Sequence, residues 1–414
     1  MSIKIPRNKL YFTKGALLKA SGLLFTKRTS EGGYIHKFEK EFSNFIGIKH
    51  AIAFSSGKLA LYLCLKALGA KSGDKIILSD FNVPEVVALL ISYGLSPVLL
   101  DIDPYNFNIN IELIEKNIDK KTKFLLVTHI YGTPVDMEKI VYIAKKYGLK
   151  IIEDACQAVG AEYKGKKAGG LGDISYFSFG TLKIFSTLNG GMILTDDDTI
   201  ALSLREEIKK YHYPKRGKLL SEILKVNFIM FFTNPKVFNN FTFPILFFID
   251  RYNEELRFKL FQGKEISHIS SQELSLLKEK FSNLQAFIGL ENFKSLEDNI
   301  SRYSAKAALL NGMLIQKGIL FQQCPENSKS AYFKYVIRAR NREQVLKRMF
   351  NSGVDLTCGY IKSCSSITNF KEFSMNCPES LRLMRENIYL PIHSLTSYDH
   401  ARYMVGLLSK VVER

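Results

Sequence analysis

Tryptophan is absent from this chain, cysteine and proline are scarce, and no run of eighteen uninterrupted apolar residues occurs. The missing apolar run argues against an ordinary membrane-spanning helix. The six cysteines form no Cys-x-x-Cys pair, so we expect neither a disulfide framework nor a metal site. That cysteine usage favours a reduced, cytoplasmic protein. No periodic placement of glycine or proline is evident, which argues against a fibrous chain.

The chain does have a globular composition, with 46% hydrophobic and 24% charged residues among 414. Apolar content of this kind supports a large core and rules out intrinsic disorder. Acidic residues are in deficit, because 40 Asp and Glu face 58 Lys and Arg and leave a net charge of +18. This excess favours partners such as nucleic acid, acidic lipid headgroups or phosphorylated metabolites. A lysine-rich, solvated surface without such a partner accounts for it equally well.

The N-terminal half alternates between short apolar strands and amphipathic helices, which is typical of a parallel α/β sheet. The last two strands follow each other without a helix, so we expect them to be connected differently. The prediction is a mostly parallel sheet covered by helices, within a large domain at residues 1–205. The predicted strands are 51–54, 75–78, 97–101, 124–128, 150–153, 174–178 and 191–194, and the predicted helices are 59–68, 85–93 and 137–147.

Residues 206–275 lose this rhythm and form a Phe-rich, basic insertion. Its segment 226–250 holds eight phenylalanines, is broken by Pro235 and Pro244, and has Lys and Arg on both sides. Such a segment is too broken to span a bilayer but is suited to the interface, with its cations toward anionic headgroups. A buried helical hairpin or a Phe-rich dimer contact would also explain it.

The remaining residues predict one long connecting helix and a smaller domain. Apolar residues spaced for one buried face indicate a helix over 276–315. Residues 316–414 then alternate strands with helices and predict a small α+β domain, with a strand at 332–338 and helices at 342–351 and 398–411.

Three chemically significant groups follow strands of the predicted sheet. Ligands bind beyond the carboxyl ends of strands in an open parallel sheet. Ser56-Gly57-Lys58 opens a helix, where free amides can hold a phosphate, while Asp154 ends a buried strand and Lys183 lies between the last two strands. Each has an ordinary alternative as a helix cap or a surface charge. Together they are the three parts that pyridoxal 5'-phosphate needs: a phosphate cradle, a carboxylate for the ring nitrogen and a lysine for the aldehyde.

Seven ordered blocks give the chain a resemblance to the DegT-type (DegT/StrS) sugar aminotransferases, which are fold-type I pyridoxal-phosphate enzymes. The resemblance covers nearly the whole length and is weakest between about Glu206 and Leu276. It implies the fold-type I PLP-transferase architecture. The blocks are GGYIHKFEKEF from Gly32, AIAFSSG from Ala51, SPVLLDIDP from Ser96, HIYGTPVDM from His129, IIEDACQAVGA from Ile151, YKGKKAGGLGDISYFSF from Tyr163 and NLQAFIGL from Asn283.

The resemblance assigns a role to each matching residue. Lys183 would be the Schiff-base lysine and the catalytic proton carrier, and Asp154 would bind the pyridinium nitrogen. Gln157 would lie against the cofactor ring, and Ser178 would bind the phosphate with the backbone of Gly57 and Lys58. The expected cofactor-binding residues are therefore Ser56, Gly57, Lys58, Asp154, Gln157, Ser178, Lys183 and Asn189, with no metal.

Some positions depart from the family pattern. Lys58 stands where threonine is common, and Asn189 stands where an acidic residue is usual. Residues 278–280 (Lys-Glu-Lys) align with an Asn-Tyr-Arg segment that reaches the partner subunit's phosphate in the family. Dehydratase-like relatives have histidine in place of the lysine, so Lys183 favours amino transfer over dehydration.

The resemblance implies a homodimer that moves an amino group from an amino acid, expected to be glutamate, to a keto-sugar. The sugar would be nucleotide-linked or lipid-linked, and the product would serve amino-sugar, lipopolysaccharide or other polysaccharide biosynthesis. The alternatives are a PLP-dependent sugar dehydratase and a basic, non-catalytic protein that binds nucleic acid or membrane. No helix-turn-helix, zinc finger or aromatic-basic RNA motif is evident, so we expect no nucleic-acid partner. We expect a cytoplasmic enzyme, peripheral on the inner face of the membrane if 226–250 contacts anionic lipid.

Overall fold

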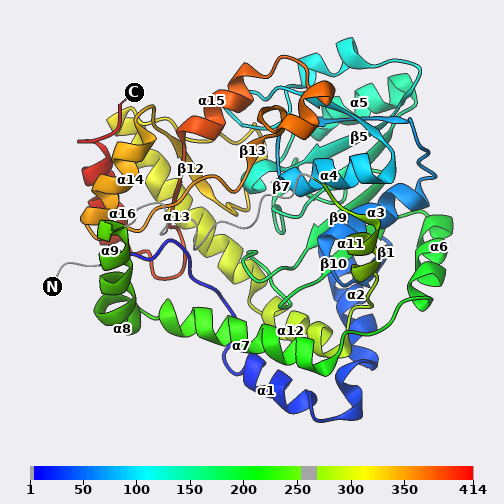
Figure 1. Cartoon of the computed structure of the whole chain (residues 1–414), viewed down its shortest axis with the longest axis horizontal. Coiled ribbons are helices and arrows are strands. Elements are labelled where there is room, and N and C mark those ends of the chain that lie inside the picture. The colour runs from blue at the N-terminus through cyan, green and yellow to red at the C-terminus, as the bar shows by residue number, and fades with distance from the viewer. Residues whose placement is uncertain (1–3, 253–267, 414) are drawn as a thin grey trace.

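Seven strands form the central sheet of the computed structural model, which describes residues 4–252 and 268–413 (Figure 1). Five neighbouring strands pair parallel to one another. At one side of them β10 pairs antiparallel with β9, and the edge strand β1 pairs antiparallel with β10. The expected mostly parallel sheet is confirmed, and so is the different connection of its last two strands. In spatial order the strands are β1 (His50–Phe54), β10 (Gly191–Thr195), β9 (Ile174–Ser178), β6 (Lys150–Asp154), β5 (Thr122–Thr128), β2 (Lys75–Ser79) and β4 (Ser96–Leu100).

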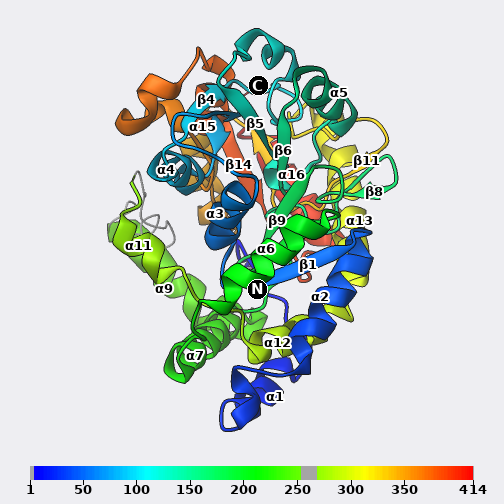
Figure 2. The same ribbon diagram turned by 90° about the vertical axis from the view of Figure 1, so that its right-hand side faces the viewer.

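Helices cover both faces of this sheet (Figure 2). On one face lie α3 (Gly57–Ala67), α4 (Pro84–Tyr93) and α6 (Asp198–Lys209); on the other lie α2 (Gly33–Ile46) and α5 (Met137–Tyr147). Because both faces are covered, the strands are continuous apolar runs rather than alternating ones.

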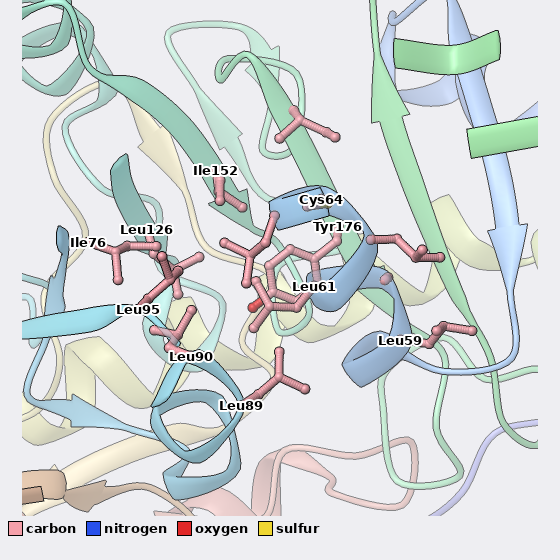
Figure 3. Packing of buried hydrophobic residues seen from close by; sticks show 14 of the residues in the cluster. Leu59, Leu61, Cys64, Ile76, Leu89, Leu90, Leu95, Leu126, Ile152 and Tyr176 are labelled. Carbon is pink, nitrogen blue, oxygen red and sulfur yellow. The ribbon is translucent and has the colours of Figure 1, made fainter. Parts of the chain in front are cut away.

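The core between α3 and the sheet contains the largest cluster of buried apolar side chains. Leu61 and Cys64 of α3 pack toward Ile152 and Tyr176 of the strands (Figure 3). Each fully buried side chain of this size contributes about 1.5–3 kcal/mol to folding. This packing fixes the start of α3 beside the carboxyl ends of β6 and β9.

One predicted element was wrong: the single helix over 276–315 is two helices, α12 (Asn283–Phe293) and α13 (Leu296–Lys317). Ser295 between them has a non-helical backbone, and its hydroxyl donates to the carbonyl of Asn292 (3.1 Å). The side chain of Asn292, in the last turn of α12, accepts from the Thr13 amide (2.9 Å) and donates to the Ser186 carbonyl (2.9 Å). Short polar side chains such as those of Ser and Asn compete with the helical backbone for hydrogen bonds. The spacing of apolar residues, from which one helix was predicted, does not reveal this competition.

A second core lies beside the sheet and is built mostly from the C-terminal residues. Strands β12 (Tyr335–Arg338) and β14 (Asn387–Leu390) pair antiparallel and pack with α13, α14 (Arg342–Asn351) and α16 (Tyr398–Leu408). Helix 342–351 agrees with the prediction, whereas the strand predicted from 332 begins at Tyr335 and the helix predicted to 411 ends at Leu408.

Residues 216–252 of the Phe-rich insertion fold as helices along one edge of the molecule (Figure 1), and residues 253–267 of the insertion lie outside the described residues. The inner face of α7 (Arg216–Phe232) packs near α1 (Ala16–Leu23) and α12, and α9 (Phe243–Tyr252) packs on Phe350 of α14. Between them lie α8 (Pro235–Val237) and the π-helical turn η5 (Phe238–Thr242). Within the described residues, no helix combines the length and apolar character needed to cross a membrane.

Candidate active site

Lys183 lies in the loop between β9 and β10, half-buried against side chains from the C-terminal part of the chain. Its Nζ donates to the Tyr360 hydroxyl (3.3 Å) and lies 4.7 Å from the centre of the Phe333 ring. Neither aromatic residue was predicted from the sequence. Their contact with Lys183 is tertiary, and no local motif marks them.

Several ionisable side chains act on the pKa of Lys183. Burial alone would lower this pKa, but electrostatic interactions with Tyr360, Cys156 and Asp154 outweigh burial and raise it above the ordinary value. Asp154 is therefore near enough to Lys183 to act on its charge. The lysine and the carboxylate, predicted separately at two strand ends, lie at one site.

Asp154 is a buried carboxylate at the end of β6, only 3% exposed. It accepts hydrogen bonds from the Cys156 amide (3.0 Å) and the Thr128 hydroxyl (3.3 Å), and Asn82 Nδ2 donates to that hydroxyl (3.2 Å). Within residues 4–252 and 268–413, no Lys, Arg or His forms an ion pair with it. A buried charge without a partner is costly, so a cation from a bound ligand would suit this position.

The start of α3 forms a small polar cradle beside β9. The Ser56 hydroxyl accepts from the Leu59 amide (3.2 Å) and fixes the first turn, whose leading amides have no acceptor inside the helix. A Cβ atom on Gly57 would lie 2.8 Å from Cβ of Ser178 and 3.5 Å from Sγ of Cys156. Only glycine therefore allows the helix start to approach the Ser178 hydroxyl this closely.

These features fit pyridoxal 5'-phosphate. The amides at the start of α3 and the Ser178 hydroxyl are suited to the phosphate, and the unpaired Asp154 carboxylate is suited to a protonated ring nitrogen. Lys183 provides the amine that the aldehyde requires. Within the described residues, no group of three or more His, Cys, Asp or Glu could hold a metal ion.

Three other residues predicted to bind the cofactor make contacts with the protein instead or are exposed. Gln157 is buried, and its side-chain oxygen accepts from the Tyr131 amide (3.0 Å), which supports the left-handed backbone of Tyr131. Asn189 is exposed, binds the amide of Gly190 (3.0 Å) through its own side chain, and lines a small cavity away from Lys183. Lys58 is exposed on α3 and helps to lower the pKa of Glu273, after the stronger effect of the Ser270 hydrogen bonds.

A buried hydrogen bond between histidine and glutamate supports the loop that leads into β9. His129 Nε2 lies 2.8 Å from Oε1 of Glu153, and both side chains are fully buried. The Glu153 carboxylate also accepts from the amides of Leu171 (2.9 Å) and Gly172 (3.0 Å) and from Gly169. Burial raises the pKa of Glu153, but His129 and these amides outweigh burial and hold it below the ordinary value. The glycine-rich stretch before β9 thus has a structural role.

We expect Glu153→Ala to lower the free energy of unfolding by about 3–5 kcal/mol, because it leaves a buried imidazole and three amides without their acceptor. Urea unfolding followed by circular dichroism measures this. The matched control is Glu115→Ala, which removes an exposed pair with Lys146 and should cost at most about 1 kcal/mol. Equal losses for the two variants would contradict the structural role.

Comparison with known proteins supports the same identification. The family model for DegT/DnrJ/EryC1/StrS aminotransferases matches residues 16–228 and 255–409. The chain is 42% identical over 177 residues to the GDP-perosamine synthase of Caulobacter vibrioides, covering 43% of this chain and 48% of that protein. It thus spans about half the length of the curated relatives that it first matches.

Two further likenesses extend over most of the chain. The UDP-2-acetamido-2-deoxy-3-oxo-D-glucuronate aminotransferase of Pseudomonas aeruginosa is 29% identical over 333 residues, covering 80% of this chain and 77% of that protein. The crystal structure of the E. coli GDP-4-keto-6-deoxy-D-mannose-3-dehydratase with bound hydrated PLP superposes with a TM-score of 0.76 at 20% identity, over 99% of this chain and 100% of the other. This likeness confirms the fold-type I architecture. The chain belongs to the DegT/DnrJ/EryC1/StrS aminotransferase family.

Proposed function

We propose that this protein is a PLP-dependent aminotransferase that moves an amino group from glutamate to a nucleotide-linked keto-sugar in amino-sugar and cell-surface polysaccharide biosynthesis. The observation that carries the proposal is the position of Lys183 beside the unpaired, buried carboxylate of Asp154. Two relatives bear the names of a GDP-perosamine synthase and a UDP-linked glucuronate aminotransferase, and these names support a nucleotide-linked substrate.

Each residue has a separate task in this proposal. Pyridoxal phosphate, when bound, supplies the electron sink that transamination needs. Lys183 accepts and returns the proton, and Asp154 stabilises positive charge at the ring nitrogen. Asn82 and Thr128 orient that carboxylate, while the start of α3 and Ser178 hold the phosphate. The three remaining predicted residues, Asn189, Gln157 and Lys58, would lie around the cofactor and support the residues that bind it.

The test is to incubate the purified protein with L-glutamate and a panel of nucleotide-linked 3-keto and 4-keto hexoses. We expect 2-oxoglutarate and an amino-sugar in equal amounts, measured by mass spectrometry, and cofactor absorbance in the protein as purified. Loss of water from the sugar without nitrogen transfer would favour the dehydratase alternative. Absence of cofactor absorbance together with nucleic-acid binding would favour a basic, non-catalytic protein.

We also propose a homodimer in which Lys280 takes the place of the family's arginine at the neighbouring subunit's phosphate. Lys280 forms a bridge with Phe54, at the end of β1 and directly before the residues of the cradle. Nζ of Lys280 lies 4.9 Å from the centre of the Tyr213 ring, so the charge of this lysine lies at the edge of the sheet formed by β1. Light scattering after size exclusion measures the dimer, and a monomer that retains full activity would contradict it.

We propose further that the cytoplasmic enzyme contacts the anionic inner face of the membrane through its insertion, segment 226–250. Helices α7 and α9 each bury one face and expose apolar residues on the other at helical spacing. The family model does not match residues 229–254, so part of this surface, including Phe231 and Phe248, lies outside the family match. The exposed side chains are Leu220, Leu224, Phe228 and Phe231 of α7, and Phe241 of η5 with Ile245, Phe248 and Tyr252 of α9.

The charge of the insertion matches such a surface. Residues 215–252 contain six Lys or Arg and two Asp or Glu. Lys225, Lys236 and Arg251 are all exposed near the apolar side chains. Aromatic residues insert at the level of the headgroups while nearby cations bind anionic lipid. A lipid-linked rather than nucleotide-linked acceptor would then also be within reach.

We expect the variant Phe228→Ser/Phe231→Ser/Phe248→Ser to lower binding to phosphatidylglycerol vesicles by about tenfold or more, because it removes three exposed aromatic anchors. Vesicle flotation measures the bound fraction. The control is Tyr105→Ser/Tyr142→Ser, which removes two exposed aromatic residues elsewhere and should bind like the wild type. Flotation that is equally absent from all three proteins would contradict membrane contact.

A further inference from the structure

A cavity beside Lys183 is lined by the N-terminal segment as well as by the C-terminal core. The wall residues include cations and aromatic side chains but no Asp or Glu. Segment Arg7–Tyr11 forms one side, and Phe333–Tyr335 with Tyr389–His393 forms another. We call this space the N-terminal cavity. Its composition is suited to a negatively charged ligand.

Lys334 is a second lysine in this cavity. Its Nζ donates to Oδ1 of Asn8 (2.9 Å) and lies 5.2 Å from the centre of the Phe333 ring, the ring that Lys183 also contacts. The two ammonium groups thus share one aromatic neighbour. Because the Asn8 oxygen accepts from Lys334, its NH2 group remains available as another donor.

No carboxylate forms an ion pair with Lys334 among the described residues. Arg7, another cation that lines the cavity, is already engaged by Asp355 through two hydrogen bonds (2.7 and 2.6 Å). Burial, followed by the charges of Lys183 and Arg7, lowers the pKa of Lys334 to about 8. Burial also lowers the pKa of His393 to about 4, so that ring is neutral near neutral pH and contributes no charge.

This arrangement is unfavourable for folding alone, because a half-buried ammonium faces another cation without a counter-ion. Such strain persists in proteins where function requires it. The phosphate of the cofactor has its own cradle at α3, on Gly57 and Ser178. An anion bound in the N-terminal cavity would therefore come from a substrate rather than from the cofactor phosphate.

We propose that Lys334 and Asn8 form a carboxylate-binding site next to Lys183, which positions a substrate by its carboxylate and rests on the proposed aminotransferase function. In an amino acid the carboxylate is attached to the carbon that carries the reacting amino group, so it must lie close to Lys183. A uronic-acid sugar would present the same group. Lys334 is thus a specificity-determining residue that favours acidic substrates.

The test compares Lys334→Met and Lys334→Arg with the wild type, and with Lys410→Met as a matched change at an exposed lysine. The probe is glutarate, a dicarboxylate without an amino group, whose binding is measured by calorimetry on the protein as purified. We expect Lys334→Met to weaken glutarate binding about 10- to 100-fold, because a charged hydrogen bond is lost. Arginine should restore most of the affinity, and Lys410→Met should have no effect.

Two kinetic arms identify the source of the carboxylate. A higher KM for glutamate in Lys334→Met assigns the site to the amino donor, whereas a higher KM confined to uronic-acid sugars over neutral hexoses assigns it to the acceptor. Equal glutarate, glutamate and uronate affinities in wild type and Lys334→Met would overturn the proposal. Glutarate binding that depends on Lys334 in a protein without amino transfer would overturn only the proposed function.

A stability measurement separates a binding role from a purely structural one. The pKa of Lys334 is lowered from 10.5 to about 8 in the folded state, so its proton opposes folding at neutral pH, and the penalty disappears as the pH rises through 10.5. The charged groups that face it are Lys183 and Arg7, the latter with Asp355. We expect Lys334→Met to melt at a higher temperature than wild type near neutral pH. A lower melting temperature would mark Lys334 as a structural residue and would count against the proposal.

Discussion

Replacement of Lys183 by alanine is expected to abolish amino transfer, with turnover lowered about 10⁴-fold or more, because the variant loses both the amine for the cofactor aldehyde and the proton carrier. The absorbance of the lysine-linked cofactor should disappear with it. Since Lys183 is half-buried and its ammonium group donates to the Tyr360 hydroxyl at the long distance of 3.3 Å, the fold should be retained without it. Stopped assays of 2-oxoglutarate and an absorbance spectrum check both effects.

Leu182→Ala is the matched control for that experiment. Leu182 is the adjacent residue in the same loop and is 56% exposed, so its truncation disturbs the backbone locally without removing the amine. We expect near-normal turnover from it. An active Lys183→Ala protein with unchanged absorbance would disprove the assignment of the lysine, and with it the aminotransferase proposal.

The second large effect is expected from Asp154→Asn. The amide keeps the shape of the side chain, and its single oxygen can still accept from the Cys156 amide while its NH2 group faces the Thr128 hydroxyl, but the charge is removed. Turnover should fall about 10²–10³-fold, which is the usual cost of losing a preorganised electrostatic contact to developing charge. Steady-state kinetics at saturating cofactor measures it.

The melting temperature of Asp154→Asn is the control that separates lost catalysis from lost stability. Because no cation among the described residues pairs with Asp154, neutralising it removes an uncompensated buried charge, and the melting temperature should stay the same or rise. Thr128→Val removes the orienting hydroxyl and should cost less turnover than the charge itself. Wild-type turnover in Asp154→Asn would refute a role at the ring nitrogen.

Local sequence pattern was enough to predict the sheet and the principal chemical groups. Strand Ile174–Ser178 and helix Met137–Tyr147 have the predicted bounds, because apolar runs and helical spacing are set by near neighbours. Gly57, Asp154 and Lys183 were predicted from their places at a helix start, at a strand end and between two strands, whereas Ser178 was predicted only from the family resemblance. Their spatial proximity follows from the topology of a parallel sheet.

Residues that contact Lys183 across long stretches of chain could not be predicted. Tyr360 is 177 positions from Lys183, and Asn8 is 326 positions from Lys334. No periodicity encodes such contacts. The break between α12 and α13 at Ser295 was missed for a related reason. The side chain of Asn292 in the last turn of α12 bonds to Thr13 and Ser186, which are distant in the sequence.

The N-terminal segment is attached to the C-terminal core rather than to the sheet that it precedes. Ile5 pairs with Val354, Arg7 binds Asp355, and Nε2 of His393 lies 2.7 Å from the carbonyl oxygen of Pro6. An affinity tag or fusion partner placed before Ile5 would therefore lie next to a wall of the N-terminal cavity, whereas Glu413 contacts Asn341, which does not line it. Recombinant enzyme for substrate screening should carry its tag at the C-terminal end.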